Sequence, residues 1–88
     1  MKVILSPRAE KYLKKLNKIG QLAIASKIRK IASSPNLEEE KILRGYRNIF
    51  RIRIADYRIV YRRQKNETHI ILIGHRKDIY KLFTRLLN

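Results

Sequence analysis

The chain has 88 residues, of which 22 are Lys or Arg and 7 are Asp or Glu, so its formal net charge is +15. This length predicts one domain over residues 1–88, and the 44% share of hydrophobic residues predicts a modest core instead of disorder. The absence of cysteine excludes a disulfide framework, a thiol nucleophile and a cysteine-based zinc site.

The N-terminal half is predicted to form a short strand followed by two amphipathic helices. Residues 2–5 favour a strand, and Ser6-Pro7 predicts a helix start, with serine as the N-cap and proline in the first helical position. Apolar residues at helical spacing then form two stripes, before and after a turn at residues 17–20. The stripes are Ala9, Tyr12, Leu13 and Leu16, and Ile24, Ala25, Ile28, Ile31 and Ala32. Residues 33–36, which include a proline, are expected to end the second helix.

The C-terminal half changes from helical to alternating periodicity after a polar connector at residues 37–48. Apolar and arginine side chains interleave over residues 50–54 and again over residues 57–61, which predicts two strands with one buried face each. Ala55-Asp56 between them predicts a hairpin. Because Ala-Asp is not a favoured two-residue turn, a longer loop with the same pairing is the alternative.

A third strand and a final helix complete the predicted fold. Residues 70–73 are apolar throughout and predict a strand buried on both faces, and Asp78 is placed to cap the helix after it. The order is therefore β-α-α-β-β-β-α. It predicts an α+β fold of two layers, in which an N-terminal αα-hairpin and a C-terminal helix pack against one face of an antiparallel meander.

The first hairpin is predicted to carry a face of arginines. Pairing Ile54 with Tyr57 separates an apolar face from a basic one, and a slip of one residue would mix the two. The basic face holds Arg51, Arg53, Arg58 and Arg62. Like charges opposed on a sheet cost roughly 0.2–1 kcal/mol per pair, so the pattern favours a bound anion, and guanidinium groups suit phosphate. A solvated face, with long arginine stems covering apolar surface, is the alternative.

The overall charge also calls for a polyanionic partner, since self-repulsion opposes compaction. RNA or DNA is the first candidate, because neutralised phosphates release counterions. The longest apolar run, residues 70–73, is too short to cross a bilayer, and residues 1–7 hold no signal-peptide core. We therefore expect a cytoplasmic domain with no membrane partner.

Four segments together resemble a known family. They are Leu43-Arg44-Gly45, Phe50-Arg51-Ile52-Arg53-Ile54, Asp56-Tyr57-Arg58-Ile59-Val60-Tyr61, and Gly74-His75-Arg76 with Tyr80 four residues on. This pattern resembles the RelE/ParE toxin superfamily, and within it the RelE branch of mRNA-cleaving toxins from prokaryotic toxin–antitoxin pairs. The resemblance implies that the catalytic residues are Arg51, Arg53, Arg58, Arg76 and Tyr80.

The resemblance further implies that mRNA is cut in the ribosomal A site. Cleavage without metal or other cofactor is expected, by attack of the 2′-hydroxyl on the adjacent phosphate. Asp56, Glu67 and Asp78 form no plausible carboxylate cluster for a metal, and the sequence has no His-x-x-x-His pair. Further RNA contacts are expected from Arg44, Arg62 and Lys77.

The group that accepts the proton is left open by the sequence. The second-strand positions are lysines in well-studied members of the family but are Arg51 and Arg53 here, and arginine stays protonated in proteins. Proton handling therefore falls to Tyr80, to His75, or to the RNA and the ribosome themselves.

The place of Arg76 is also open. If Arg63 pairs with Thr68 in the second hairpin, then His75 and not Arg76 shares the face of Arg58. A β-bulge, a strand that ends at residue 74, or a different turn would each bring Arg76 to that face.

An antitoxin is the implied protein partner, RelB-like, with an acidic and partly disordered segment that wraps the αα-hairpin. Two other functions stay open. One is that of a ParE-like toxin, which acts on DNA gyrase, although that branch generally lacks the basic catalytic set. The other is a basic nucleic-acid-binding module without chemistry, which the two arginines in place of lysines favour.

Overall fold

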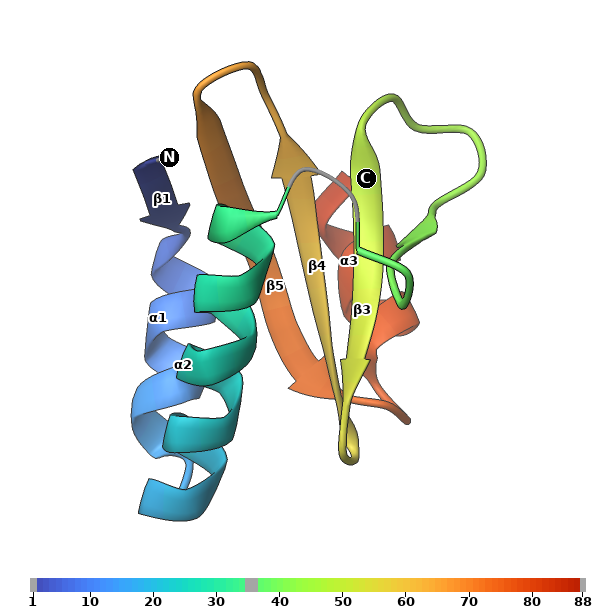
Figure 1. Cartoon of the computed structure of the whole chain (residues 1–88). Helices are drawn as coiled ribbons and strands as arrows, with labels where there is room; N and C mark the ends of the chain where they lie inside the picture. The colour runs from blue at the N-terminus through green and yellow to red at the C-terminus, as the bar shows by residue number, and fades with distance from the viewer. Residues whose placement is uncertain (1, 35–36, 88) are drawn as a thin grey trace.

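The computed structural model describes residues 2–34 and 37–87. The elements are β1 (Lys2–Leu5), α1 (Pro7–Lys15), α2 (Lys18–Ser33), β2 (Lys41–Ile42), β3 (Ile49–Ile54), β4 (Tyr57–Arg63), β5 (Glu67–His75) and α3 (Ile79–Leu87). The strands form one sheet in the order β1-β5-β4-β3-β2 (Figure 1). β1 runs parallel to β5, and the other neighbours are antiparallel. None of the helices in these ranges has the length and apolar character needed to span a membrane.

The helix starts follow from capping side chains. The Ser6 hydroxyl accepts a hydrogen bond from the Ala9 N–H at 3.0 Å and donates to the Ile71 carbonyl at 2.6 Å, so it both caps α1 and ties it to β5. Asn17 caps α2 by accepting the Gly20 N–H at 2.8 Å. The predicted start of α1 is confirmed. α2 ends at Ser33; Pro35 and Asn36, which were expected to end it, lie outside the described residues.

The helices cover both faces of the sheet (Figure 1). α1 and α2 pack on one face, in a core made of Ala9, Ile24, Ile28, Ile31, Ile52, Ile59, Tyr61, Ile70 and Ile73. α3 packs on the opposite face, in a second core made of Ile49, Val60, Leu72, Ile79 and Phe83. The α+β class is confirmed, and the predicted elements occur in the predicted order. The short strand β2 is an addition, because it lies within residues 37–48, which were expected to be a connector without a strand. α3 lies on the opposite face of the sheet from α1 and α2, whereas all the helices were expected on one face. The physical reason is that β3, β4 and β5 each contribute an apolar side chain to the second face.

The register of β3 with β4 is the predicted one. Ile54 pairs with Tyr57, and Arg53 lies directly opposite Arg58. The loop is the two-residue Ala55-Asp56 connection, and not the longer alternative. Ala55 adopts a φ of 52°, a left-handed conformation that two-residue hairpin turns require and that alanine rarely takes.

A buried polar network ties the connector before β2 to the sheet. Glu40 and Arg63 form an ion pair of 3.0 Å between the Glu40 Oε1 and Arg63 Nη2 atoms, with side chains only 7% and 13% exposed. The Tyr61 hydroxyl donates to the same carboxylate oxygen, and Arg63 Nη1 donates to the Ile31 carbonyl at 3.1 Å. This network therefore links the connector, α2 and β4.

The network makes stability sensitive to alkaline pH. Burial, the hydrogen bond to Glu40 and the charge of Glu40 raise the pKa of Tyr61 well above its ordinary value of 10.0, against the opposing effect of Arg63. The unfolded chain therefore loses the Tyr61 proton first, and stability should fall by about 1.4 kcal/mol for each pH unit above about 10 from this group. We expect Tyr61→Phe to flatten this alkaline slope in chemical denaturation measured at several pH values. A Tyr46→Phe control, at an exposed phenol, should keep the slope; equal slopes in both variants would contradict the assignment.

Candidate active site

The arginine face lies on the side of the sheet that α3 covers. Arg53 and Arg58 are direct cross-strand partners, and Arg51 lies two residues along β3, opposite Val60. Within the described ranges, no carboxylate forms an ion pair with any of these three arginines. Two like charges held opposite each other without a counter-ion favour an external anion at this place.

A β-bulge brings Arg76 to the same face. Arg63 pairs with Thr68, as considered from the sequence, but the register shifts between Val60 and Tyr61 because β5 contains one extra residue there. Gly74 therefore lies opposite Arg58, and the alternation that follows directs Arg76 toward the arginine face. Of the three alternatives for Arg76, the structure shows the bulge.

Arg76 is anchored by the tip of the first hairpin. Its N–H donates to the Asp56 carbonyl at 2.8 Å. Its Nε atom lies 4.0 Å from the Asp56 carboxylate, and both side chains are more than half exposed, so this ion pair is weak. The backbone hydrogen bond positions the residue and leaves its guanidinium group available to a ligand.

Gly74 allows α3 to approach the sheet and so positions Tyr80. A Cβ atom at residue 74 would lie 3.1 Å from the Ile79 Cδ1 atom and 3.5 Å from the Leu82 Cδ1 atom. The first turn of α3 therefore packs directly over the glycine, beside Arg58, and leaves the Tyr80 side chain 46% exposed.

Replacing this glycine tests the close approach. We expect Gly74→Val to lower the free energy of unfolding by about 1–3 kcal/mol, because its larger side chain overpacks against Ile79. Urea denaturation measures the change. If Gly74→Val were as stable as the wild type, the packing of α3 on the sheet would not require glycine at this position.

The charged groups that act on Arg58 belong to the other members of the expected site. The pKa of Arg58 is lowered from its ordinary value, first by partial burial and then by the positive charges of Arg53, Arg51 and Arg76, while Tyr80 acts in the opposite direction. Arg58 is thus the central member of a group that we call the arginine cradle: Arg51, Arg53, Arg58 and Arg76, with Tyr80 at its edge.

Other residues expected at the site lie elsewhere. His75 is on the opposite face of the sheet, where its ring meets Tyr57 edge-on at a centroid distance of 6.4 Å. Its Nδ1 atom accepts the Lys77 N–H at 3.1 Å. The bulge that turns Arg76 toward the cradle turns His75 away from it. This placement removes the geometric basis for proton handling by His75.

The three further RNA-binding candidates are not part of the cradle. Arg62 shares the face of Arg58 but lies beyond Val60, paired with Ile49, and its charge does not enter the electrostatics of Arg58. Arg44 is an exposed residue of the turn after β2. Lys77 is exposed in the connection from β5 to α3.

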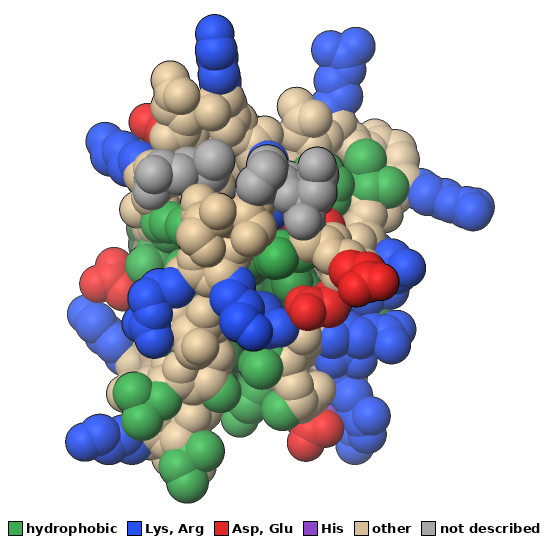
Figure 2. All heavy atoms as spheres, in the orientation of Figure 1, with side chains coloured by type: hydrophobic (Ala, Val, Ile, Leu, Met, Phe, Trp, Pro, Cys, Tyr) green, Lys and Arg blue, Asp and Glu red, His purple; other side chains and the backbone are tan. Residues whose placement is uncertain are grey.

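One basic residue at the site was missed. Lys41 on β2 pairs with Arg51, and it therefore lies on the cradle's face of the sheet. β2 is two residues long, so it carries no alternating pattern that could have indicated a strand. Charge alone does not find the site either, because Figure 2 shows Lys and Arg side chains spread around the face of α1 and α2 as well.

Comparisons with known proteins agree with this geometry. The sequence matches the family model of the ParE toxin of type II toxin–antitoxin systems (parDE) over residues 3–80. A chain in the crystal structure of the intact E. coli RelBE toxin–antitoxin complex is 27% identical, with a TM-score of 0.74, and the match covers 84% of this chain and 94% of that one. A search of curated protein sequences found no significant match.

Two more solved structures extend the likeness. The isolated E. coli RelE toxin is 25% identical, with a TM-score of 0.74 over 99% of this chain and 98% of that one. A chain of the RelB–RelE antitoxin–toxin complex from Methanococcus jannaschii is 25% identical, with a TM-score of 0.68 over 91% and 98%. The chain therefore belongs to the ParE toxin family of type II toxin–antitoxin systems, and its fold is that of the RelE toxins.

Proposed function

We propose that this toxin cleaves mRNA in the ribosomal A site without a metal ion, and so stops translation. The observation that carries the proposal is the arginine cradle, in which the charges of three other arginines act on Arg58. Among the described residues, the one ion pair of a cradle arginine is the weak contact of Arg76 with the exposed Asp56. Repulsion between these positive charges lowers the stability of the free protein, and the negative charge of a bound phosphodiester compensates for it.

The proposed reaction uses the RNA as its own nucleophile. The 2′-oxygen loses its proton and bonds to the adjacent phosphorus, and the bond from phosphorus to the 5′-oxygen breaks as that oxygen takes up a proton. The products are a 2′,3′-cyclic phosphate and a 5′-hydroxyl. Negative charge grows on the phosphoryl oxygens in the transition state, and preorganised guanidinium donors stabilise it there.

Proton transfer is assigned to Tyr80, to the RNA or to the ribosome. Arginine cannot accept a proton at neutral pH, so Arg51 and Arg53 serve to hold phosphate. Tyr80 is 46% exposed and interacts electrostatically with Arg58. Unlike His75, it lies on the side where the phosphate would bind.

The proposed protein partner is a RelB-like antitoxin with an acidic segment. Two of the similar solved structures are RelB–RelE complexes. The charge of +15 favours association with an acidic chain that folds on binding. Antitoxin binding over the cradle would block RNA from reaching it.

The proposed cleavage is tested on translating ribosomes. The toxin is expressed alone, and the 5′ ends of a reporter message are mapped by primer extension. We expect cuts in phase with codons that disappear in Arg76→Ala and appear only when the message is translated. Intact messages in growth-arrested cells would contradict the proposal.

Inhibition of DNA gyrase is the second candidate, favoured by the match to the family model named for ParE toxins. Its signature is relaxation of plasmid supercoiling with messages left intact. If neither cleavage nor relaxation occurs while RNA is still bound, the chain is a nucleic-acid-binding module without chemistry.

A further inference from the structure

His75 is the last residue of β5, and it makes three hydrogen bonds around the turn that follows the strand. Its carbonyl accepts the Asp78 N–H at 2.9 Å, and its Nδ1 atom accepts the Lys77 N–H at 3.1 Å. Its backbone also hydrogen-bonds to the hydroxyl of Tyr12 on α1. Arg76 lies inside this set of contacts, so His75 surrounds a cradle residue although its own ring lies on the opposite face of the sheet.

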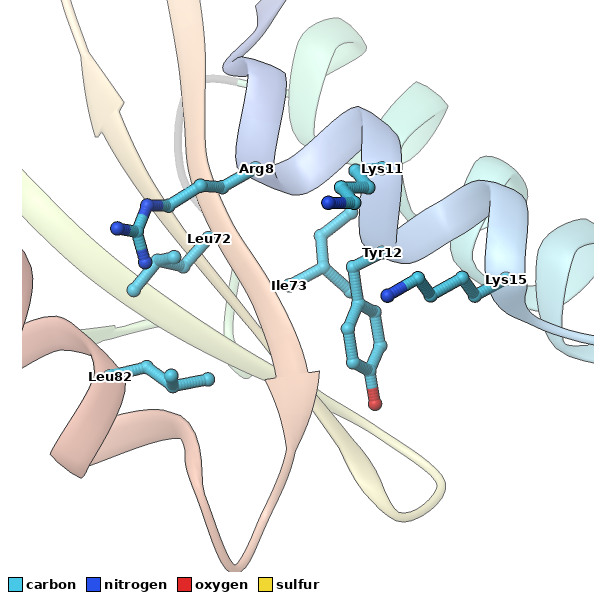
Figure 3. A pocket seen from close by; sticks show the side chains of 7 residues that line it. All are labelled: Arg8, Lys11, Tyr12, Lys15, Leu72, Ile73 and Leu82. Carbon is cyan, nitrogen blue, oxygen red and sulfur yellow. The ribbon is translucent and has the colours of Figure 1, made fainter.

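The ring of His75 is fixed by aromatic contacts on that opposite face. It meets the Tyr57 ring edge-on with centroids 6.4 Å apart. Tyr57 in turn meets the Tyr12 ring edge-on, also at 6.4 Å. Figure 3 shows the Tyr12 side chain reaching from α1 toward the end of β5. These contacts hold the imidazole in one orientation, with its Nδ1 atom directed at the backbone of the turn.

The contact of the Nδ1 atom with the Lys77 N–H has the form of an Asx turn. In such a turn, a side-chain acceptor binds the backbone N–H two residues later and stabilises the bend. The Nδ1 atom of histidine and the Oδ1 atom of asparagine are both bonded to Cγ, so the two side chains present an acceptor at the same place. For histidine, this role requires a neutral ring that carries its proton on Nε2.

We propose that His75 is a positioning residue of the active site. Its Nδ1 atom holds the turn of residues 76–78, and the turn holds Arg76 in the cradle on the other face of the sheet. The inference rests on the proposed function, because it takes Arg76 to be a phosphate-binding residue. It goes beyond that function by giving His75 a role in which no proton is transferred.

The turn is attached on both sides, so a change at its centre reaches the cradle. The Arg76 N–H donates to the Asp56 carbonyl at 2.8 Å, and the Leu82 N–H donates to the Asp78 carbonyl at 3.0 Å in the first turn of α3. Without the Nδ1 acceptor, the Lys77 N–H would bond to water and the turn would populate other conformations. Arg76 would then move away from the phosphate, and a misplacement of about 1 Å can lower a rate about 100-fold.

Two substitutions with the same functional group separate the acceptor from the rest of the ring. His75→Asn keeps an oxygen at the place of Nδ1, whereas His75→Gln places its amide one methylene farther out. Both remove the imidazole and its capacity for proton transfer. In single-turnover cleavage on programmed ribosomes, His75→Asn should stay within about 3-fold of the wild-type maximum rate, and His75→Gln should lose about 10-fold or more. The ribosome concentration at half-maximal rate should be unchanged in both.

His69→Gln is the matched control, at the other histidine of β5. The Nε2 atom of His69 lies 2.9 Å from the Glu67 carboxylate, at the opposite end of the strand from the turn. This variant should cleave at the wild-type rate. A loss equal to that of His75→Gln would overturn the inference, because it would show that the loss does not depend on the turn.

Amide hydrogen exchange in the free toxin tests the same inference without RNA. The Arg76 amide should exchange faster in His75→Gln than in the wild type, and His75→Asn should restore its protection. Equal cleavage rates in His75→Asn and His75→Gln, or equal exchange of the Arg76 amide in both, would overturn the inference. If the wild type cleaved no message, the proposed function would fail, and the exchange measurement would still decide the role of His75.

Discussion

Arg58→Ala is expected to lower the rate of mRNA cleavage by about 100-fold or more, the usual loss when one charge-stabilising donor is removed from an active site. Arg58 lies at the centre of the cradle, where the charges of Arg51, Arg53 and Arg76 all act on it. The Arg58 guanidinium group donates a hydrogen bond to the Tyr57 carbonyl at 2.9 Å, and this contact holds the side chain near the turn of the β3–β4 hairpin. The measurement is single-turnover cleavage of a message on programmed ribosomes.

Arg62→Ala is the matched control for this prediction. Arg62 is on the same strand and the same face, but beyond Val60 and outside the cradle. It should lose no more than a few-fold in rate, through weaker binding to the RNA backbone. Equal losses in the two variants would mean that the toxin needs positive charge on this face and not the arrangement around Arg58.

Glu40→Ala is expected to lower the free energy of unfolding by about 3–5 kcal/mol, because it leaves the charge of Arg63 buried without its partner. The two side chains are 7% and 13% exposed, and the same carboxylate oxygen also accepts the Tyr61 hydroxyl. For a domain whose total stability is about 5–15 kcal/mol, this loss is large. Urea denaturation followed by circular dichroism gives the value.

Glu39→Ala serves as the neighbouring control. Glu39 pairs with Lys27 at 3.0 Å, but its side chain is 53% exposed. An ion pair of this kind contributes less than about 1 kcal/mol. If Glu39→Ala and Glu40→Ala lowered the free energy of unfolding by the same small amount, the buried network would not be the interaction that holds the connector before β2 against the sheet.

The parts of the fold that the sequence could predict are those with a repeating pattern. The αα-hairpin and the register of β3 with β4 follow from apolar residues at a fixed spacing, and a slip of the hairpin would bury arginines. The Ser6-Pro7 helix start was predictable because capping is local.

The parts that the sequence left open or placed wrongly depend on single residues or on tertiary packing. The bulge in β5 adds one residue to an uninterrupted apolar run, so nothing in the pattern distinguishes it. The placement of α3 depends on Val60 and Leu72, which give the second face of the sheet an apolar surface. Their neighbours on β4 and β5 are also apolar, so the sequence does not show which face a helix will cover. The turn at Ala55 has a conformation that its residue type disfavours.

The candidate site divides in the same way. The cross-strand pairing of Arg53 with Arg58 was predictable from the alternating pattern. Arg76 and Tyr80 were expected only through the family resemblance. In the structure, the β-bulge directs Arg76 toward Arg58, and the close approach of α3 at Gly74 positions Tyr80. His75 illustrates the limit, since a shift of one residue moved it to the other face of the sheet.

The most direct test of the cradle is to observe its guanidinium groups while an RNA phosphate is bound. A dinucleotide with a 2′-O-methyl group cannot supply the nucleophile, so it binds without being cut. In NMR spectra of the arginine side chains, the Nε resonances of Arg51, Arg53, Arg58 and Arg76 should shift together and saturate at one ligand concentration, while those of Arg29 and Arg62 stay in place. Shifts spread evenly over all the arginines, or absent from these four, would contradict the account.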